Sequence, residues 1–260
     1  MRGGYIWIVK GLLTDALVAV QFLTVAPALL RRSVTPRELG NSVAYFSLVG
    51  LLIGLLLFGL QRLLQAVFPA AVGAAILLGV WILCSGALHF DGFVDAVDGL
   101  LGGRTTDDRL RILRDEGVGA FAVAAGGTLL LLKFGSLGVI GAKPVALIAA
   151  PLLGRWVISA AVVLCPYARA EGLGRAMKEN SGWRHFVGAS AFTAAALVVL
   201  APPAGIVAMA AAVVAAGLGA WLLIRFTLGR IPGLTGDIYG ALCEVTEALC
   251  LVTLVAHWPH

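Results

Sequence analysis

Apolar residues run through this chain in long stretches, and short polar segments separate them. A membrane-spanning helix needs about 20 mostly apolar residues, and the stretches of about that length cover residues 12–30, 43–60, 70–88, 119–141, 144–165, 187–201, 203–224 and 239–257. Pro202-Pro203 predicts a tight turn between the sixth and seventh stretches. Lys10, Asp15 and Gln21 interrupt or flank the first stretch, so it either spans the membrane or lies flat at the interface. The pattern predicts an all-α polytopic membrane protein with seven or eight transmembrane helices.

Composition excludes a soluble globular protein. Of the 260 residues, 60% are hydrophobic and 13% are charged, and the mean hydropathy is +0.97, whereas soluble domains carry about 25% charged residues. The apolar stretches recur to residue 257, so they are not a cleaved signal peptide. We expect residues 1–260 to form a single integral membrane catalytic domain. Gly50-x-x-x-Gly54 predicts close helix packing in lipid.

The basic residues are distributed unevenly along the chain. There are 19 Lys and Arg against 14 Asp and Glu, and 13 of the 19 lie in residues 31–42, 89–118, 166–186 and 225–238. By the positive-inside rule, these loops face the cytoplasm of a bacterial or archaeal cell. Basic loops at a membrane surface explain the net charge of +5, so we expect membrane lipid as a partner and no nucleic acid.

Two groups of acids carry the candidate chemistry. Asp91, Asp95 and Asp98 stand at i, i+4 and i+7, which places them within an arc of about 60° on a helix. Converged carboxylates repel unless a cation lies among them, and oxygen ligands suit Mg²⁺, Mn²⁺ or Ca²⁺. The alternative is a solvated helix face or a helix cap.

The second group, which follows the seventh stretch, consists of Asp237, Glu244 and Glu247, within an arc of about 80°. Glu244 and Glu247 reach into apolar sequence, where an ionised acid costs about 2.5–3.5 kcal/mol or more. They therefore face a polar cavity, a metal or a basic partner, and a structural ion pair with Arg155 or Lys133 is the alternative.

Arginines near the acids suit phosphate oxygens, which guanidinium groups bind in a bidentate way. Arg111 and Arg114 share a face at i, i+3, and Arg169 lies in a glycine-bearing loop. A basic helix end near lipid is alternatively a headgroup anchor. Carboxylates for a divalent metal and arginines for phosphate together predict metal-assisted phosphoryl transfer at the cytoplasmic face.

The chain resembles the membrane-embedded cobalamin synthases, the adenosylcobinamide-GDP ribazoletransferases. The motifs that carry the resemblance are Leu88-His89-x-Asp91-Gly92-x-x-Asp95-x-x-Asp98-Gly99, Arg114-Asp115 with Gly119-x-Phe121, Pro166-Tyr167-Ala168-Arg169, and Thr235-Gly236-Asp237 with Glu244-x-x-Glu247. The sequence departs from the family pattern at Glu116-Gly117 and at Leu234.

The resemblance implies that adenosylcobinamide-GDP is joined to α-ribazole or its 5′-phosphate, with release of GMP. It further implies that Asp91, Asp95, Asp98 and Asp237 hold Mg²⁺, for which Mn²⁺ substitutes, and that Asp237 or Glu244 takes the hydroxyl proton. Substrate contacts are then expected from His89, Arg111, Arg114, Asp115, Arg155, Arg169 and Glu247. A lipid alcohol-phosphotransferase and an ion-coupled transporter are the alternative functions, and the sequence leaves a homo-oligomer open.

Overall fold

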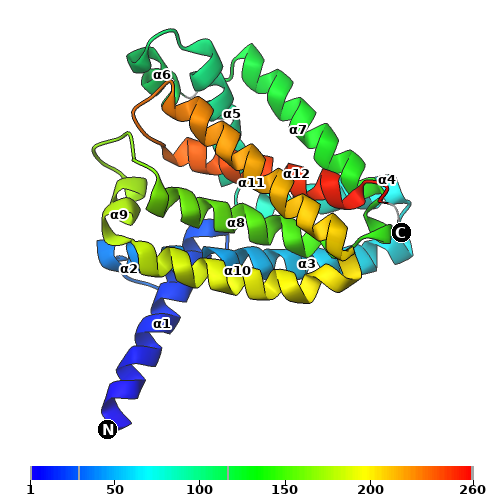
Figure 1. Ribbon diagram of the computed structural model, residues 1–260, viewed down its shortest axis with the longest axis horizontal. Coiled ribbons are helices and arrows are strands. Elements are labelled where there is room, and N and C mark those ends of the chain that lie inside the picture. The colour runs from blue at the N-terminus through cyan, green and yellow to red at the C-terminus, as the bar shows by residue number, and fades with distance from the viewer. Residues whose placement is uncertain (1, 29, 116, 259–260) are drawn as a thin grey trace.

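The structure is a computed structural model that describes residues 2–28, 30–115 and 117–258, and helices form most of it (Figure 1). An isolated bridge between Tyr167 and Leu234 is the one β pairing in these ranges. The α-helices are α1 (Arg2–Leu23), α2 (Pro36–Ser42), α3 (Phe46–Val67), α4 (Ala70–Cys84), α5 (Leu88–Gly102), α6 (Thr106–Ile112), α7 (Ala120–Gly138), α8 (Ala146–Leu164), α9 (Leu173–Asn180), α10 (Trp183–Ala204), α11 (Ile206–Leu228) and α12 (Gly236–Val255), with 3₁₀ turns η1 (Val43–Tyr45) and η2 (Ile140–Ala142).

The all-α polytopic architecture is confirmed, and the number of spans is at the low end of the prediction. Six segments of the described chain are long and apolar enough to cross a membrane, and a seventh is obtained if α4 and α5 count as one broken span. The predicted first span at 12–30 is helical only as far as Leu23, where α1 ends, and in the described chain Gly11–Leu23 is an apolar helix shorter than the six spans.

Two predicted helix boundaries differ from those in the structure because of the local backbone conformation. The stretch 70–88 is not one straight helix, since α4 and α5 meet at 86° where Gly86 and Ala87 adopt left-handed φ angles of 58° and 59°. A left-handed Ala costs about 1–2 kcal/mol, so the break is held by its surroundings. The pair Pro202-Pro203 lies inside the last turn of α10, and the chain turns instead at Gly205, where φ is 91°.

Helices α8 and α12 form the centre of the bundle. In their apolar windows 78% and 72% of residues are buried, against 11% for α10 at the periphery. The predicted packing role of Gly50 and Gly54 is confirmed, because a Cβ on Gly54 would lie 2.6 Å from the Cα of Ile148, and one on Gly50 would collide with the carbonyl of Pro151. Small residues therefore let α3 and α8 touch through their backbones.

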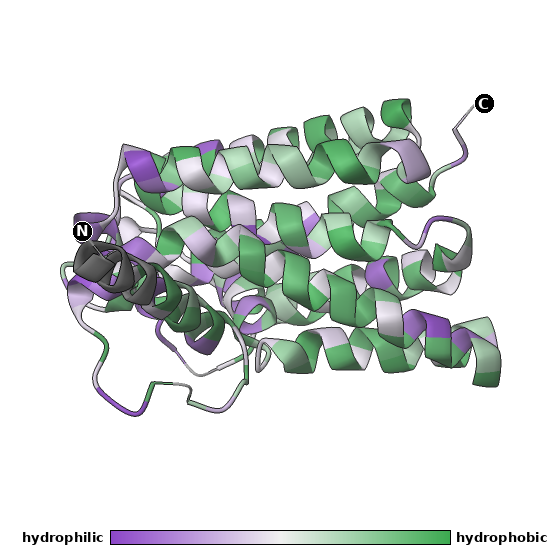
Figure 2. Cartoon of the chain, turned by 90° about the horizontal axis from the view of Figure 1, so that it is seen from below, coloured by the Kyte–Doolittle hydropathy of each residue, from purple (hydrophilic) through white to green (hydrophobic). Residues whose placement is uncertain are grey.

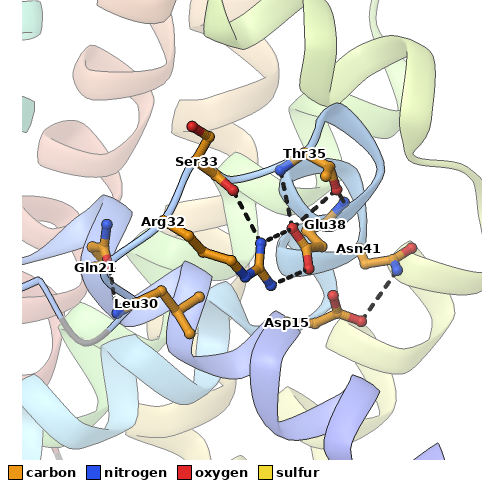
Figure 3. Close-up of polar contacts among 8 residues, drawn as sticks. All are labelled: Asp15, Gln21, Leu30, Arg32, Ser33, Thr35, Glu38 and Asn41. Atoms are coloured by element: carbon orange, nitrogen blue, oxygen red, sulfur yellow. Dashed lines mark hydrogen bonds and ion pairs between the residues drawn. The ribbon is translucent and has the colours of Figure 1, made fainter. Parts of the chain in front are cut away.

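The segment between α1 and α3 is fixed by polar contacts (Figure 3). Thr35 and Glu38 form a capping box at the start of α2, and Arg32 pairs with Glu38 at 2.6 Å. Asn41 donates to the carboxylate of Asp15 at 3.1 Å, which ties α2 to α1.

Polar residues gather mainly at the ends of the bundle, whereas its flanks are apolar (Figure 2). Figure 1 shows that the connections from α5 to α7, α8 to α10 and α11 to α12 lie at one end, beside α2, α6 and α9. These connections contain most of the basic loop residues, including Arg169 between α8 and α9.

Candidate functional site

The acids of α5 share one side of the helix, as their spacing predicts. Asp91 is exposed, Asp95 is half-buried and Asp98 is buried. Asp95 lies within electrostatic range of Asp91, Asp98 and also Asp237 of α12, with Arg169 as the nearby cation. Three other carboxylates and one guanidinium therefore lie around Asp95, which leaves a strong excess of negative charge.

Two glycines bring α5 and α12 together at the site. A Cβ on Gly240 would lie 2.8 Å from the carbonyl oxygen of His89 and 3.1 Å from the Cα of Gly92. A Cβ on Gly92 would lie 3.0 Å from the carbonyl oxygen of Asp237. Real Cβ atoms essentially never approach below 3.0 Å, so the backbone crossing requires glycine at Gly240 and leaves Asp91 and Asp237 close enough to line one cavity.

That cavity has a volume of about 150 Å³. Asp91 and Asp237 provide its charged wall, and Phe22, Leu23 and Phe46 contribute apolar wall on another side. A pocket with a few polar groups on an otherwise apolar lining is typical of a binding site for a small molecule.

Asp98 has a structural partner. Its carboxylate accepts hydrogen bonds from the backbone N–H groups of Gly119 and Ala122, the latter at 2.9 Å, at the start of α7. A carboxylate at a helix N-terminus satisfies unpaired donors and complements the helix dipole. Asp98 thus caps α7, whereas Asp91 and Asp95 have no hydrogen-bond or ion-pair partner in the described chain.

Arg169, in the loop before α9, and Asp237, in the first turn of α12, form an ion pair. The Nη2 group of Arg169 donates to Oδ2 of Asp237 at 2.6 Å and to the carbonyl of Leu113 at 3.0 Å. The loop before α9 and the loop before α12 are joined by backbone hydrogen bonds of 2.8 Å from Ala168 to Leu234 and from Leu234 to Pro166. Leu234, a departure from the family pattern, is fully buried there.

Arg111 and Arg114, two of the other predicted basic residues, lie at the surface. Arg111, Arg114 and Asp115 line an open hollow of about 420 Å³ at the end of α6, and Arg111 makes a long contact of 3.7 Å with Asp108. Leu113, between them in sequence, packs against Gly99 of α5. Glu116 lies outside the described residues.

Glu244, Glu247 and Arg155 are placed apart from the acids of α5, in a buried ion network. Lys133 of α7 donates to Glu244 at 2.5 Å and to Glu247 at 2.6 Å, and Arg155 of α8 also pairs with Glu247. Two cations balance two anions, which is how buried charges are tolerated. The structure therefore shows the ion pairs that the sequence left as the alternative to catalytic or substrate-binding roles for these three residues.

His89 lies between the cavity and this network. Its ring is buried, it lines the cavity, and its Nε2 atom has no hydrogen-bond partner in the described chain. The unpaired nitrogen is consistent with the predicted substrate contact.

No group of three or more His, Cys, Asp or Glu side chains is arranged to hold a metal ion within residues 2–28, 30–115 and 117–258. The donor chemistry nevertheless fits a divalent cation, because the unpartnered carboxylates of Asp91 and Asp95 and the paired carboxylate of Asp237 are oxygen ligands in an excess of negative charge. Asp237 is paired with Arg169, and Asp98 accepts hydrogen bonds from the start of α7.

Some contacts at the site were missed from the sequence. The crossing of Gly92 with Gly240 and the support of Arg169 by Leu113 were not predicted. A glycine beside Asp91 and another three residues after Asp237 are the signals that could have indicated the crossing.

Comparisons with known proteins agree on one family. The profile of the family described as cobalamin-5-phosphate synthase matches residues 15–255. The adenosylcobinamide-GDP ribazoletransferase of Pseudomonas paraeruginosa is 41% identical over 248 residues, which cover 93% of this chain and 98% of that protein. Proteins with the same name from Stutzerimonas stutzeri and Pseudomonas aeruginosa are each 39% identical, over 92% and 93% of this chain and 96% and 98% of their own lengths. No solved structure matches this chain at a significant level.

Proposed function

The chain belongs to the cobalamin-5-phosphate synthase family, and from this premise we propose that it is an adenosylcobinamide-GDP ribazoletransferase whose reaction takes place at the α5–α12 crossing. The observation that carries this location is the shared cavity of Asp91 and Asp237, with Asp95 beside them. Family membership leaves the lipid alcohol-phosphotransferase and the transporter without support.

The proposed reaction is a phosphoryl transfer. The ribose hydroxyl of α-ribazole, or of its 5′-phosphate, attacks the phosphorus atom that carries cobinamide. The bond from that phosphorus to the bridging oxygen breaks, and GMP leaves with the electron pair. The hydroxyl proton passes to a carboxylate. Of the two predicted bases, Asp237 lines the cavity whereas Glu244 is held by Lys133, so we assign the proton to Asp237.

The protein would neutralise the pyrophosphate from two sides. Asp91 and Asp95 are the residues to hold a divalent cation, with Asp237 as a third ligand, and we propose Mg²⁺, with Mn²⁺ as a substitute. Such a cation, when bound, offsets charge on the phosphate oxygens and on the leaving group. Arg169 adjoins the same cavity through Asp237, and Arg111 and Arg114 lie in the neighbouring hollow, where guanidinium groups suit the outer phosphate oxygens.

We place the site at the cytoplasmic face of the bacterial inner membrane. The loops that contain 13 of the 19 basic residues lie at the end of the bundle where α12 begins, with Asp237 in its first turn (Figure 1), and basic loops remain in the cytoplasm during insertion. A nucleotide-linked substrate would therefore reach the cavity from the cytoplasm.

Product analysis with purified protein tests the proposal. Protein in detergent should release GMP from adenosylcobinamide-GDP only when α-ribazole or its 5′-phosphate and a divalent ion are both present. Omission of the ion, or addition of a chelator, is the matched control. Release of GMP with a lipid alcohol in place of α-ribazole would contradict the proposed acceptor.

A further inference from the structure

The guanidinium of Arg169 uses only some of its hydrogen-bond donors. One nitrogen, Nη2, makes both of its hydrogen bonds in the described chain, 2.6 Å to Asp237 and 3.0 Å to the carbonyl of Leu113. The Nε atom is buried and has no hydrogen-bond partner in the described chain. A guanidinium carries five N–H donors and binds carboxylate or phosphate best through two of them in parallel. The present contact with Asp237 therefore leaves donors for a second anion.

Asp237, the carboxylate paired with Arg169, is also the proposed third ligand of a cation in the cavity. Asp237 accepts from Arg169 through Oδ2, which also accepts from the hydroxyl of Thr235 at 3.1 Å. Asp91 and Asp95 are without protein partners on the facing helix. A cation bound by Asp91 and Asp95 would repel the guanidinium and compete with it for Asp237.

Resting on the proposed function, we propose that Arg169 and Asp237 form an exchangeable pair. A phosphate of the substrate draws the guanidinium away from Asp237, and the released carboxylate joins Asp91 and Asp95 around the cation. The complete cation site then exists only when a phosphate-bearing substrate is present. Arg169 is in this account a positioning residue that controls the availability of Asp237.

The exchange needs a side-chain rotation and no loop movement. The backbone that leads into Arg169 is held by the hydrogen bonds from Ala168 to Leu234 and from Leu234 to Pro166, each 2.8 Å. Both members of the pair are partly open to solvent, with side-chain exposures of 21% and 20%. An anion can therefore reach the guanidinium without unfolding the site.

A double-mutant cycle with Mn²⁺ as the probe tests the exchange. The full-length chain in detergent is titrated with Mn²⁺ in the absence of nucleotide, and free Mn²⁺ is measured by electron paramagnetic resonance. Four proteins are compared: the natural chain, Arg169→Gln, Asp237→Asn and the double variant. If Arg169 withholds Asp237, then Asp237→Asn weakens Mn²⁺ binding little in the natural background but about tenfold more in the Arg169→Gln background.

An equal effect of Asp237→Asn in both backgrounds would overturn the proposal, since it would show that Asp237 contributes to Mn²⁺ binding regardless of Arg169. A metal-free titration with GDP gives the reciprocal readout. Asp237→Asn should bind GDP several-fold more tightly than the natural chain, and this gain should disappear when Arg169 is Gln. A gain that persists without Arg169 would contradict the exchange.

Thermal unfolding of each variant verifies that it is folded, and Arg169→Met, which removes the charge and keeps a side chain of similar apolar length, replaces Arg169→Gln if that variant is unstable. Additive effects in a protein that still releases GMP would refute the exchange alone. A natural chain that releases no GMP would refute the proposed function.

Discussion

Gly240→Ala probes the geometry of the site without touching its chemistry. The added Cβ would lie 2.8 Å from the carbonyl oxygen of His89, and ordinary contact begins at 3.4 Å. Because the opposing atoms are backbone, α5 and α12 would have to separate by about 0.6 Å. This separation moves Asp237 away from Asp91 and Asp95.

Both stability and turnover should fall. Overpacking costs about 1–3 kcal/mol, and the better helix propensity of Ala returns up to about 1 kcal/mol. A displacement of 1 Å costs about 10²-fold in rate, so 0.6 Å predicts a loss of roughly tenfold. The assays are GMP release at saturating substrates and thermal unfolding in the same detergent.

Gly135→Ala on α7 is the matched control, since no atom lies within 4 Å of its added Cβ and the same helix propensity is gained. Gly92→Ala, with a closest approach of 3.0 Å, should have a smaller effect than Gly240→Ala. Turnover and stability of Gly240→Ala equal to those of the control would refute the account of the α5–α12 crossing.

Other predictions concern individual polar contacts. Lys133→Met leaves Glu244 without a cation, so the free energy of unfolding in detergent should fall by about 3–5 kcal/mol. Lys133→Met combined with Glu244→Gln should recover part of this stability. An unchanged stability of Lys133→Met would contradict the network. Asp98→Ala removes the cap of α7 and should cost about 1–2 kcal/mol, with faster hydrogen exchange at Ala122 as the local readout. Burial raises the pKa of Asp15 above 3.8, so the folded state binds the proton more tightly and stability falls as pH rises from 3.8 through the raised pKa. Asp15→Asn should flatten that part of the melting-temperature profile, and an unchanged profile would contradict this.

The membrane fold could be predicted because lipid imposes a simple rule on sequence. Spans such as 144–165 and 239–257 correspond closely to α8 and α12, since every backbone polar group in lipid must be satisfied within a helix. The break between α4 and α5 was not predicted, because Ala87 carries no sequence signal for a left-handed φ. The sequence showed that polar residues interrupt the stretch 12–30, but it did not predict that the helix ends at Leu23.

The site was predicted in part. Spacing along one helix correctly placed Asp91, Asp95 and Asp98 on one side, since helical periodicity alone determines that. Spacing could not show that Asp98 caps α7 at Ala122 or that Lys133 forms an ion pair with Glu244, because the two residues of each pair are 24 and 111 positions apart in the chain. The metal roles of these acids and the substrate contacts of the arginines stay predictions.

The account depends on Asp91 and Asp95 as the carboxylates that gather a divalent cation around a pyrophosphate. The most direct measurement is GMP release from adenosylcobinamide-GDP and α-ribazole by Asp91→Asn and Asp95→Asn at saturating Mg²⁺, with thermal unfolding as the check on folding. The account predicts folded proteins with turnover abolished in both variants. Near-normal turnover of both would contradict it.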